Sequence, residues 1–176
     1  MDAVREELYT VEDIYALPDG QRVELIDGEI YDMAPPNTRH QRLSMNLSSK
    51  IVNYISQNNG DCEVFAAPFA VFLNEDNKNY FEPDISVICD KTKITDKGCN
   101  GAPDWVIEIV SPSSKPRDYN IKLFKYRNAG VREYWIVDPE TGITSVYAFE
   151  KGTVEHYFLG KDIPVGIWKG FSIKVE

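Results

Sequence analysis

A glutamate stands in the middle of a strongly apolar segment, Asp104 to Val110, which reads DWVIEIV. This composition is typical of a β-strand buried on both faces, where alternate side chains point to opposite sides. Glu108 therefore shares its face with Val106 and Val110. An ionised carboxylate buried there without a partner would cost several kcal/mol. The pattern thus requires a cation, a hydrogen-bond network or a metal ion beside Glu108, and a structural salt bridge is the simplest of these.

A second acid, Asp84, stands at the start of another apolar segment, Ile85 to Ile88. Pro83 cannot donate to a sheet ladder and suits the first position of a strand, so Asp84 projects from the strand's beginning. An aspartate at such a place is commonly a turn or cap residue. However, two carboxylates and a backbone carbonyl, with water, are also how proteins usually hold Mg²⁺. The two strands are therefore a candidate site for a hard cation.

Strands and helices are predicted along the rest of the chain in a mixed order. The pairing of Asp27 with Gly28 is a strong signal for a type I′ turn between two short strands. Apolar residues at three- and four-residue steps predict a long helix that ends near Gln57. The predicted order is helix 10–17, strands 22–26 and 29–33, the long helix, strands 62–73, 84–89 and 104–110, helix 118–128, and strands 133–137, 144–149 and 154–159. This order suits an α/β fold with a central mixed β-sheet flanked by helices. The length of 176 residues suits one domain spanning 1–176.

The charge of the chain limits the partners it can bind. Its 28 acidic and 19 basic residues give a formal net charge of −9. A dedicated nucleic-acid binder usually presents a basic face, since neutralising phosphates supplies much of its affinity. An acidic protein can still bind DNA through a local basic patch or a metal ion. The composition therefore argues against extensive DNA contacts without excluding a DNA substrate.

The compartment is predicted from the apolar windows and the cysteines. No stretch approaches the roughly 18 apolar residues of a membrane span, and the acidic N-terminus lacks the apolar core of a secretion signal. Cys62, Cys89 and Cys99 are odd in number and lack metal-binding spacing. We therefore expect a cytoplasmic protein with no membrane partner, whose thiols are reduced and packed.

The ordered series of motifs resembles the PD-(D/E)XK motif of restriction-endonuclease-like nucleases, and within that superfamily the Uma-type restriction endonucleases. The likeness spans roughly residues 9 to 160. The segments that carry it are Val23–Ile30, His40, Pro83–Ile85, Val106–Ser114, the spaced residues Asp118, Lys122 and Tyr126, and Gly130–Pro139. The resemblance implies the restriction-endonuclease-like fold. It also implies that Asp84, Glu108 and the carbonyl of Ile109 hold Mg²⁺ or Mn²⁺.

One position departs from the superfamily motif. A lysine is expected two residues after the glutamate, on the same face, and Val110 stands there instead. The family that the chain resembles carries this lysine on the following helix, which implies that Lys122 takes the catalytic role. At 100° per residue, Lys122 is expected on the border of the helix's apolar face. The alternative is a surface pair with Asp118, worth at most about 0.5 kcal/mol.

The resemblance also implies roles for Glu24 and His40. Glu24 corresponds to an N-terminal acid that joins the catalytic site in many members of the superfamily; otherwise it is an exposed hairpin residue. His40, near the start of the long helix, is a candidate proton shuttle or phosphate contact. A capping or packed histidine is the alternative.

Substrate contacts are expected beyond these groups. Ser113 lies in the loop Ser111–Ser114, whose hydroxyls could contact phosphate together with Lys115 and Arg117, although solvated loop residues are the simpler interpretation. Tyr126 is expected to contact the substrate from the helix that carries Lys122.

The leading hypothesis is hydrolysis of DNA phosphodiester bonds by metal-activated water. Val110 and the acidic composition favour an alternative, a catalytically inactive nuclease fold that serves as a binding or assembly module. A hydrolase of other phosphate compounds is a third possibility. Because nucleases that cut duplex DNA are often symmetric, a homodimer is expected. The aromatic Tyr134 and Trp135 would then lie either in the core or on the dimer face.

Overall fold

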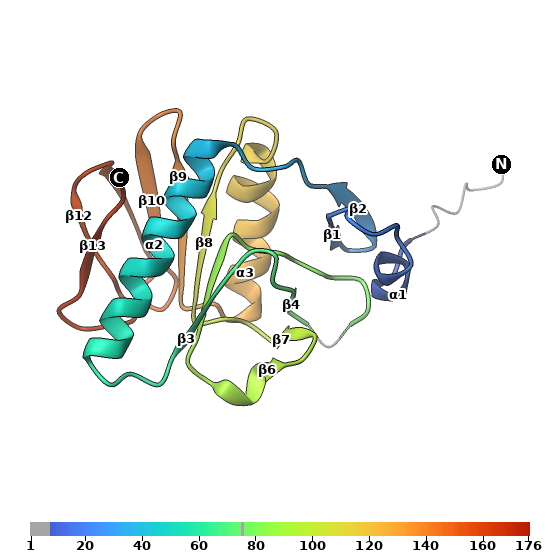
Figure 1. Cartoon of the computed structure of the whole chain (residues 1–176), viewed down its shortest axis with the longest axis horizontal. Helices are drawn as coiled ribbons and strands as arrows, with labels where there is room; N and C mark the ends of the chain where they lie inside the picture. Colours follow the sequence, from blue (N-terminus) through green and yellow to red (C-terminus); the bar gives the residue numbers. More distant parts are fainter. Residues whose placement is uncertain (1–7, 75) are drawn as a thin grey trace.

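A six-stranded mixed sheet forms the centre of the computed structural model, which describes residues 8–74 and 76–176 (Figure 1). Its strand order is β11-β10-β9-β8-β5-β3. The bounds are Thr153–Phe158 for β11, Ile143–Ala148 for β10, Glu133–Asp138 for β9, Trp105–Ile109 for β8, Ile85–Ile88 for β5 and Glu63–Ala66 for β3. β8 and β9 run parallel, and the other neighbours are antiparallel. This arrangement confirms the predicted α/β class with a central mixed sheet.

Helices cover both faces of the sheet (Figure 1). Helix α2 (Thr38–Gln57) packs a stripe of leucines and isoleucines against Trp105, Ile107 and Ile109 of β8. The opposite face of β8 carries Val106 and contacts helix α3 (Leu123–Ala129), which follows directly on a π-helix (Arg117–Lys122). The alternation predicted for this strand is therefore confirmed, and Glu108 points to the α3 side.

A short hairpin carries the N-terminal part of the site. Strands β1 (Val23–Ile26) and β2 (Glu29–Asp32) pair antiparallel after helix α1 (Val11–Tyr15). Asp27 and Gly28 both have positive φ, 52° and 86°, as the predicted type I′ turn requires. A side chain at residue 28 would also collide with Leu8, whose Cβ lies 2.8 Å from the place of an added Cβ.

The expected strand 62–73 is divided, and smaller elements were not predicted. Pro68 cannot donate to a ladder, and the segment continues as the short strand β4 (Val71–Phe72). β4 joins a second, three-stranded sheet, and two further strands form a hairpin near the C-terminus. The elements that were not predicted are η1 (Lys91–Lys93), β6 (Ile94–Thr95), β7 (Gly98–Asn100), β12 (Asp162–Pro164) and β13 (Ser172–Lys174).

The prediction of reduced cysteines is wrong for two of the three. Cys62 and Cys89 form a disulfide, while Cys99 is free and buried. The pairing follows from the antiparallel register, in which Glu63 of β3 lies opposite Ile88 of β5. Cys62, just before Glu63, therefore lies opposite Cys89, just after Ile88. The odd number of cysteines gave no sign of this cross-strand contact.

Tyr134 and Trp135 are fully buried in β9, so the core alternative holds for both side chains. Residues 1–7, which carry most of the N-terminal stretch expected to lack a secretion signal, lie outside the described residues. Within the part of the chain that the structure describes, no helix is long and apolar enough to cross a membrane.

Candidate active site

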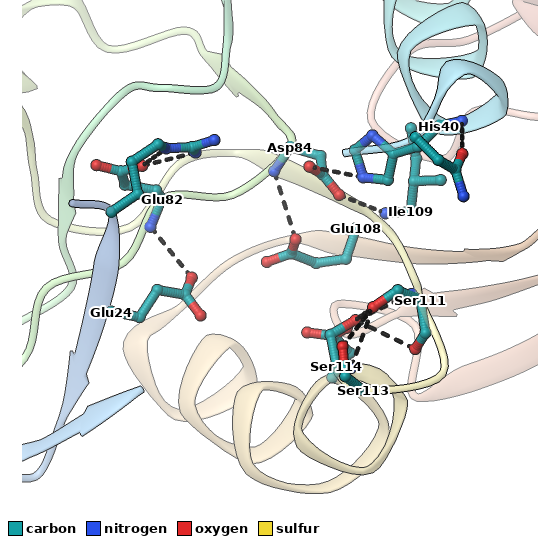
Figure 2. A network of polar contacts seen from close by, with 12 residues as sticks. Glu24, His40, Glu82, Asp84, Glu108, Ile109, Ser111, Ser113 and Ser114 are labelled. Carbon is teal, nitrogen blue, oxygen red and sulfur yellow. Dashed lines mark hydrogen bonds and ion pairs between the residues drawn. The ribbon is translucent and has the colours of Figure 1, made fainter. Parts of the chain in front are cut away.

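The two predicted acids lie side by side on neighbouring antiparallel strands. Ile85 of β5 pairs with Ile107 of β8, so the next residues outward, Asp84 and Glu108, lie opposite each other on the α3 side. The Asp84 backbone N–H donates to Glu108 Oε2 at 3.4 Å. The Ile109 N–H in turn donates to Asp84 Oδ2 at 2.7 Å (Figure 2). Local backbone pairing therefore fixes both carboxylates and the Ile109 peptide within one small region.

His40 reaches this pair from the first turn of α2. Its Nε2 lies 3.1 Å from Asp84 Oδ1, and its buried Nδ1 has no hydrogen-bond partner among the described residues. Burial lowers the pKa of His40, but the hydrogen bond and charge of Asp84 raise it, and the net direction is upward. Asn37 caps the helix by accepting from the His40 N–H at 2.9 Å, so the capping alternative for His40 is wrong.

Lys122 lies inside the site rather than on the helix border. Its Nζ is 2.9 Å from Glu108 Oε1, 2.8 Å from Glu24 Oε1 and 3.3 Å from Asp118 Oδ1, and the residue is 3% exposed. The alternative of a surface pair with Asp118 is therefore wrong, since both members are buried. Burial lowers the pKa of Lys122, but the three carboxylates outweigh it and hold the pKa well above its usual value. The ammonium form is thus the stable one.

The local backbone explains why the helix-border prediction was wrong. The segment Arg117–Lys122 is π-helical, so its side chains do not follow the 100° step of an α-helix. Asp118, the second residue of this segment, and Lys122, its last, are both buried. Tyr134 of β9 supports the turn by donating its hydroxyl to the Asp118 carbonyl at 3.1 Å.

Glu24 completes the group of acids from the β1–β2 hairpin. It is 1% exposed, which excludes the alternative of an exposed hairpin residue. Both faces of β1 are buried, and the Leu25 backbone bonds with Tyr80 on a separate segment. Glu24 Oε1 accepts from the Glu82 N–H at 3.2 Å as well as from Lys122.

Tyr126 does not line the pocket, so the prediction that it contacts the substrate is wrong. Its side chain is fully buried, and its hydroxyl donates to Glu108 Oε1 at 2.9 Å. Lys122 and Tyr126 therefore bind the same oxygen of Glu108. Among the described residues, the other oxygen, Oε2, receives only the long bond from the Asp84 N–H. Tyr126 thus orients the carboxylate from behind.

The charges of the site do not balance. Four of the carboxylates that line the pocket share two cationic partners: those of Glu24, Glu108 and Asp118 contact Lys122, and that of Asp84 contacts His40. Burial raises the pKa of Glu108 well above its usual value; Lys122 lowers it, and the neighbouring acids raise it further. The pKa of Asp118 is also raised, first by burial. A divalent cation would offset this excess of negative charge, so the donor set fits a hard metal ion.

The possible metal ligands are few. No three His, Cys, Asp or Glu side chains of residues 8–74 and 76–176 form a group that could hold a metal ion. The ligand set that the family resemblance implies has only two carboxylates, those of Asp84 and Glu108, with the Ile109 carbonyl, so water would fill the other positions, as is usual for Mg²⁺.

A pocket with a volume of about 220 Å³ opens above these groups. Glu24, Asp84, Glu108 and Lys122 line it together with the loop that carries Ser113, an exposed residue whose Oγ is 3.0 Å from Ser111 Oγ (Figure 2). The loop is held by reciprocal bonds, because the Ser111 N–H donates to Ser114 Oγ and the Ser114 N–H to Ser111 Oγ. Val110 also lines the pocket and brings no charge, so the lysine of the site is Lys122.

The chain is similar to known proteins in sequence and in fold. Residues 8–172 match the model of the Uma2 family, which is described as "Putative restriction endonuclease". The chain belongs to the Uma2 family. Two uncharacterized proteins of Synechocystis, sll1609 and slr1290, are similar to it. They are 31% identical over 121 residues and 30% identical over 118 residues.

The extent of these matches differs between the relatives and the solved structure. Both alignments cover about two thirds of this chain, and they span 67% of sll1609 and 60% of slr1290. A crystal structure from Anabaena variabilis, titled as a "putative nuclease belonging to DUF820", superimposes with a TM-score of 0.75 and covers 94% of each chain. At 22% identity, this likeness shows a shared fold.

Two residues of this Uma2 pocket were missed or undervalued from the sequence. Asp118 was named among the segments that carry the resemblance and as a surface partner of Lys122 but was given no role in the site, although it is a buried acid that lines the pocket. Arg22 was given no role, yet it lines the pocket and binds Glu82 Oε2 through Nε and Nη2 at 2.9 and 2.7 Å. Neither has a motif of its own, since both depend on segments distant in the sequence.

Proposed function

We propose that this Uma2 protein is a metal-dependent endonuclease that hydrolyses phosphodiester bonds of DNA, with Mg²⁺ or Mn²⁺ as cofactor. The observation that carries the proposal is the contact between Lys122 and Glu108 beneath an open pocket. It supplies a lysine next to the acid pair although Val110 occupies the motif position. Membership of the family and the nuclease fold support the same reaction class.

Asp84, Glu108 and the Ile109 carbonyl would hold the metal. A bound divalent ion lowers the pKa of its water and neutralises charge that develops on the phosphate. Tyr126 and Lys122 hold Glu108 Oε1, which leaves Oε2 for the cation. His40 contacts the same aspartate from the pocket side and is a candidate proton shuttle or phosphate contact.

Lys122 acts as a cation in this proposal. The three carboxylates around it raise its pKa, which favours the ammonium form. A protonated ammonium can orient the attacking water and stabilise the negative charge of the transition state.

The test is cleavage of supercoiled plasmid and of single-stranded DNA in the presence of Mg²⁺ or Mn²⁺. We expect cleavage by the purified protein, its loss on addition of a chelator, and its loss in the Glu108→Ala variant. If the wild-type protein cleaves no more than Glu108→Ala does, the proposal of an enzyme is wrong.

A second candidate, a binding or assembly module without catalysis, is favoured by Val110 and the net charge of −9. Calorimetry separates the two candidates, because the enzyme must bind the metal and lose that affinity on Asp84→Asn. Absence of both metal and DNA binding would favour the module.

We also propose a homodimer for duplex cleavage, which light scattering coupled to size exclusion measures.

A further inference from the structure

The cations that line the pocket differ in whether a carboxylate already binds them. Lys122 contacts three acids, Arg22 is bound by Glu82, and His40 contacts Asp84. Arg117 lines the same pocket, and no carboxylate among the described residues forms an ion pair with it. Arg117 is therefore the cation of this pocket whose charge has no carboxylate partner in the described part of the protein.

The side chain of Arg117 is held in place without using its donors. Its guanidinium carbon lies 4.8 Å from the centre of the Tyr31 ring of β2. A guanidinium at this distance over a ring face is attracted by the π-system without forming a hydrogen bond to it. The Nε atom is buried and has no hydrogen-bond partner among the described residues. The guanidinium is thus positioned by Tyr31, and its Nε donor is unsatisfied.

The neighbouring basic residue provides a contrast. Lys115, two residues earlier, contacts Asp138 Oδ2 at 2.6 Å and does not line the pocket. Lys115 and Arg117 were equivalent candidates in the sequence, but only Arg117 is placed to contact a molecule in the pocket. Ser113 lines the same wall and offers a hydroxyl as a second donor.

We propose that Arg117 binds a backbone phosphate of the nucleic acid next to the one that is cut, assisted by the hydroxyl of Ser113. The inference rests on the proposed function, since it names a contact for that same substrate. Phosphate is the anion that the proposed substrate supplies, and a planar guanidinium can bind it bidentately. In a protein with a net charge of −9, a local contact of this kind also offers one way to hold a polyanion.

The test measures how salt weakens DNA binding in the wild-type protein and in three variants. A labelled oligonucleotide, single-stranded or duplex, is titrated with the intact protein in Ca²⁺ buffer at several salt concentrations. Each lost phosphate contact reduces the slope of log affinity against log salt by about 0.7 for single strands or about 0.9 for duplexes. We expect this reduction for Arg117→Gln and an unchanged slope for Lys115→Gln, which removes the same charge from the same segment. Arg117→Lys keeps the charge and is expected to keep the slope while binding more weakly.

The outcomes separate the subsite from the reaction. If the wild-type protein cleaves DNA and Arg117→Gln, with an unchanged melting temperature, keeps the wild-type slope, the subsite is wrong and the nuclease proposal stands. Equal slope losses in Arg117→Gln and Lys115→Gln would also overturn the subsite, because they would show a general effect of charge. If the wild-type protein neither binds nor cleaves DNA, both proposals are wrong.

Discussion

Two buried glutamates on neighbouring strands have opposite surroundings. Glu108 of β8 and Glu133 of β9 are 4% and 1% exposed, and burial raises the pKa of each. Glu133 lies on the α2 side, where both of its oxygens accept short bonds from neutral donors: the Trp135 indole N–H at 2.6 Å and the Ile167 N–H at 2.9 Å. Glu108 contacts a lysine and lies among three other acids.

The difference separates an acid held by hydrogen bonds inside the fold from an acid that faces a pocket among other carboxylates. Glu133 does not line the pocket, and its hydrogen bonds hold the C-terminal segment on the sheet. Glu108 lines the pocket, and its neighbours leave Oε2 with one long bond and the site with excess negative charge. Buried acids whose charge is offset incompletely by the protein are candidates for cation binding.

The largest effect is expected from removing the cation beside Glu108. Lys122→Met leaves Glu24, Glu108 and Asp118 without their shared counter-charge, so the free energy of unfolding should fall by about 3–5 kcal/mol. Urea denaturation in metal-free buffer measures this loss, and added Mg²⁺ should recover part of it. The exposed Lys174→Met is the control, with a change of at most about 1 kcal/mol. Similar losses of unfolding free energy in the two variants would show that Lys122 is not needed to balance the charges of the buried acids.

The next effect concerns the metal itself. Asp84→Asn removes one of the two proposed carboxylate ligands. Loss of a residue that only hydrogen-bonds to a metal ligand lowers metal affinity by up to about 100-fold. Loss of a direct ligand should therefore lower the affinity for Mn²⁺ by more than about 100-fold. Isothermal titration calorimetry measures the change, and Asp162→Asn, a substitution of an exposed acid, serves as the control. Unchanged Mn²⁺ affinity in Asp84→Asn would remove Asp84 from the proposed ligands.

A smaller effect is expected from the donors that orient the two glutamates. Tyr126→Phe removes a hydrogen bond to Glu108 Oε1, so kcat should fall by about 10-fold with little change in KM. Trp135→Phe removes the indole donor to Glu133 and should lower the melting temperature without lowering kcat per folded molecule. Steady-state cleavage kinetics and thermal melts measure both variants. If Tyr126→Phe affects stability alone, the proposed orienting role of Tyr126 is wrong.

The smallest effect concerns the pH dependence of stability at Glu133. Burial raises its pKa above the usual 4.5, while the Trp135 and backbone donors lower it, and the net direction is upward. The native state therefore keeps this proton at a pH where the unfolded chain has lost it, so stability falls as pH rises from about 4.5 through the folded-state pKa. Glu133→Gln should lack this contribution. The measurement is the difference between the denaturation midpoints of the wild-type protein and Glu133→Gln, followed across this pH range. A difference that does not change with pH would contradict the raised pKa.

The sequence predicted the parts of this contrast that depend on local pattern. Alternation in β8 correctly placed Glu108 opposite the face of Trp105, and Pro83 correctly marked the entry to β5. Family likeness pointed to Lys122, and the structure places its ammonium group beside Glu108. The catalytic roles of these residues stay predictions until cleavage is measured.

Contacts between distant segments and departures from regular geometry could not be predicted. The π-helix changes the direction of Lys122, and no periodicity analysis at 100° per residue anticipates it. Burial of Glu24 depends on the segment that contains Tyr80, and the disulfide depends on the β3–β5 register. Glu108 and Glu133 both occur in apolar strands, so only their tertiary partners distinguish them.

Cleavage of plasmid DNA with Mg²⁺ by two matched variants tests the central claim most directly. Glu108→Gln and Glu133→Gln each neutralise one buried glutamate without changing its size. We predict that Glu108→Gln reduces cleavage to background, whereas Glu133→Gln keeps wild-type cleavage per folded molecule, as determined from a parallel melt. Equal cleavage by the two variants, or cleavage retained in Glu108→Gln, would contradict the assignment of the Glu108 pocket as the active site.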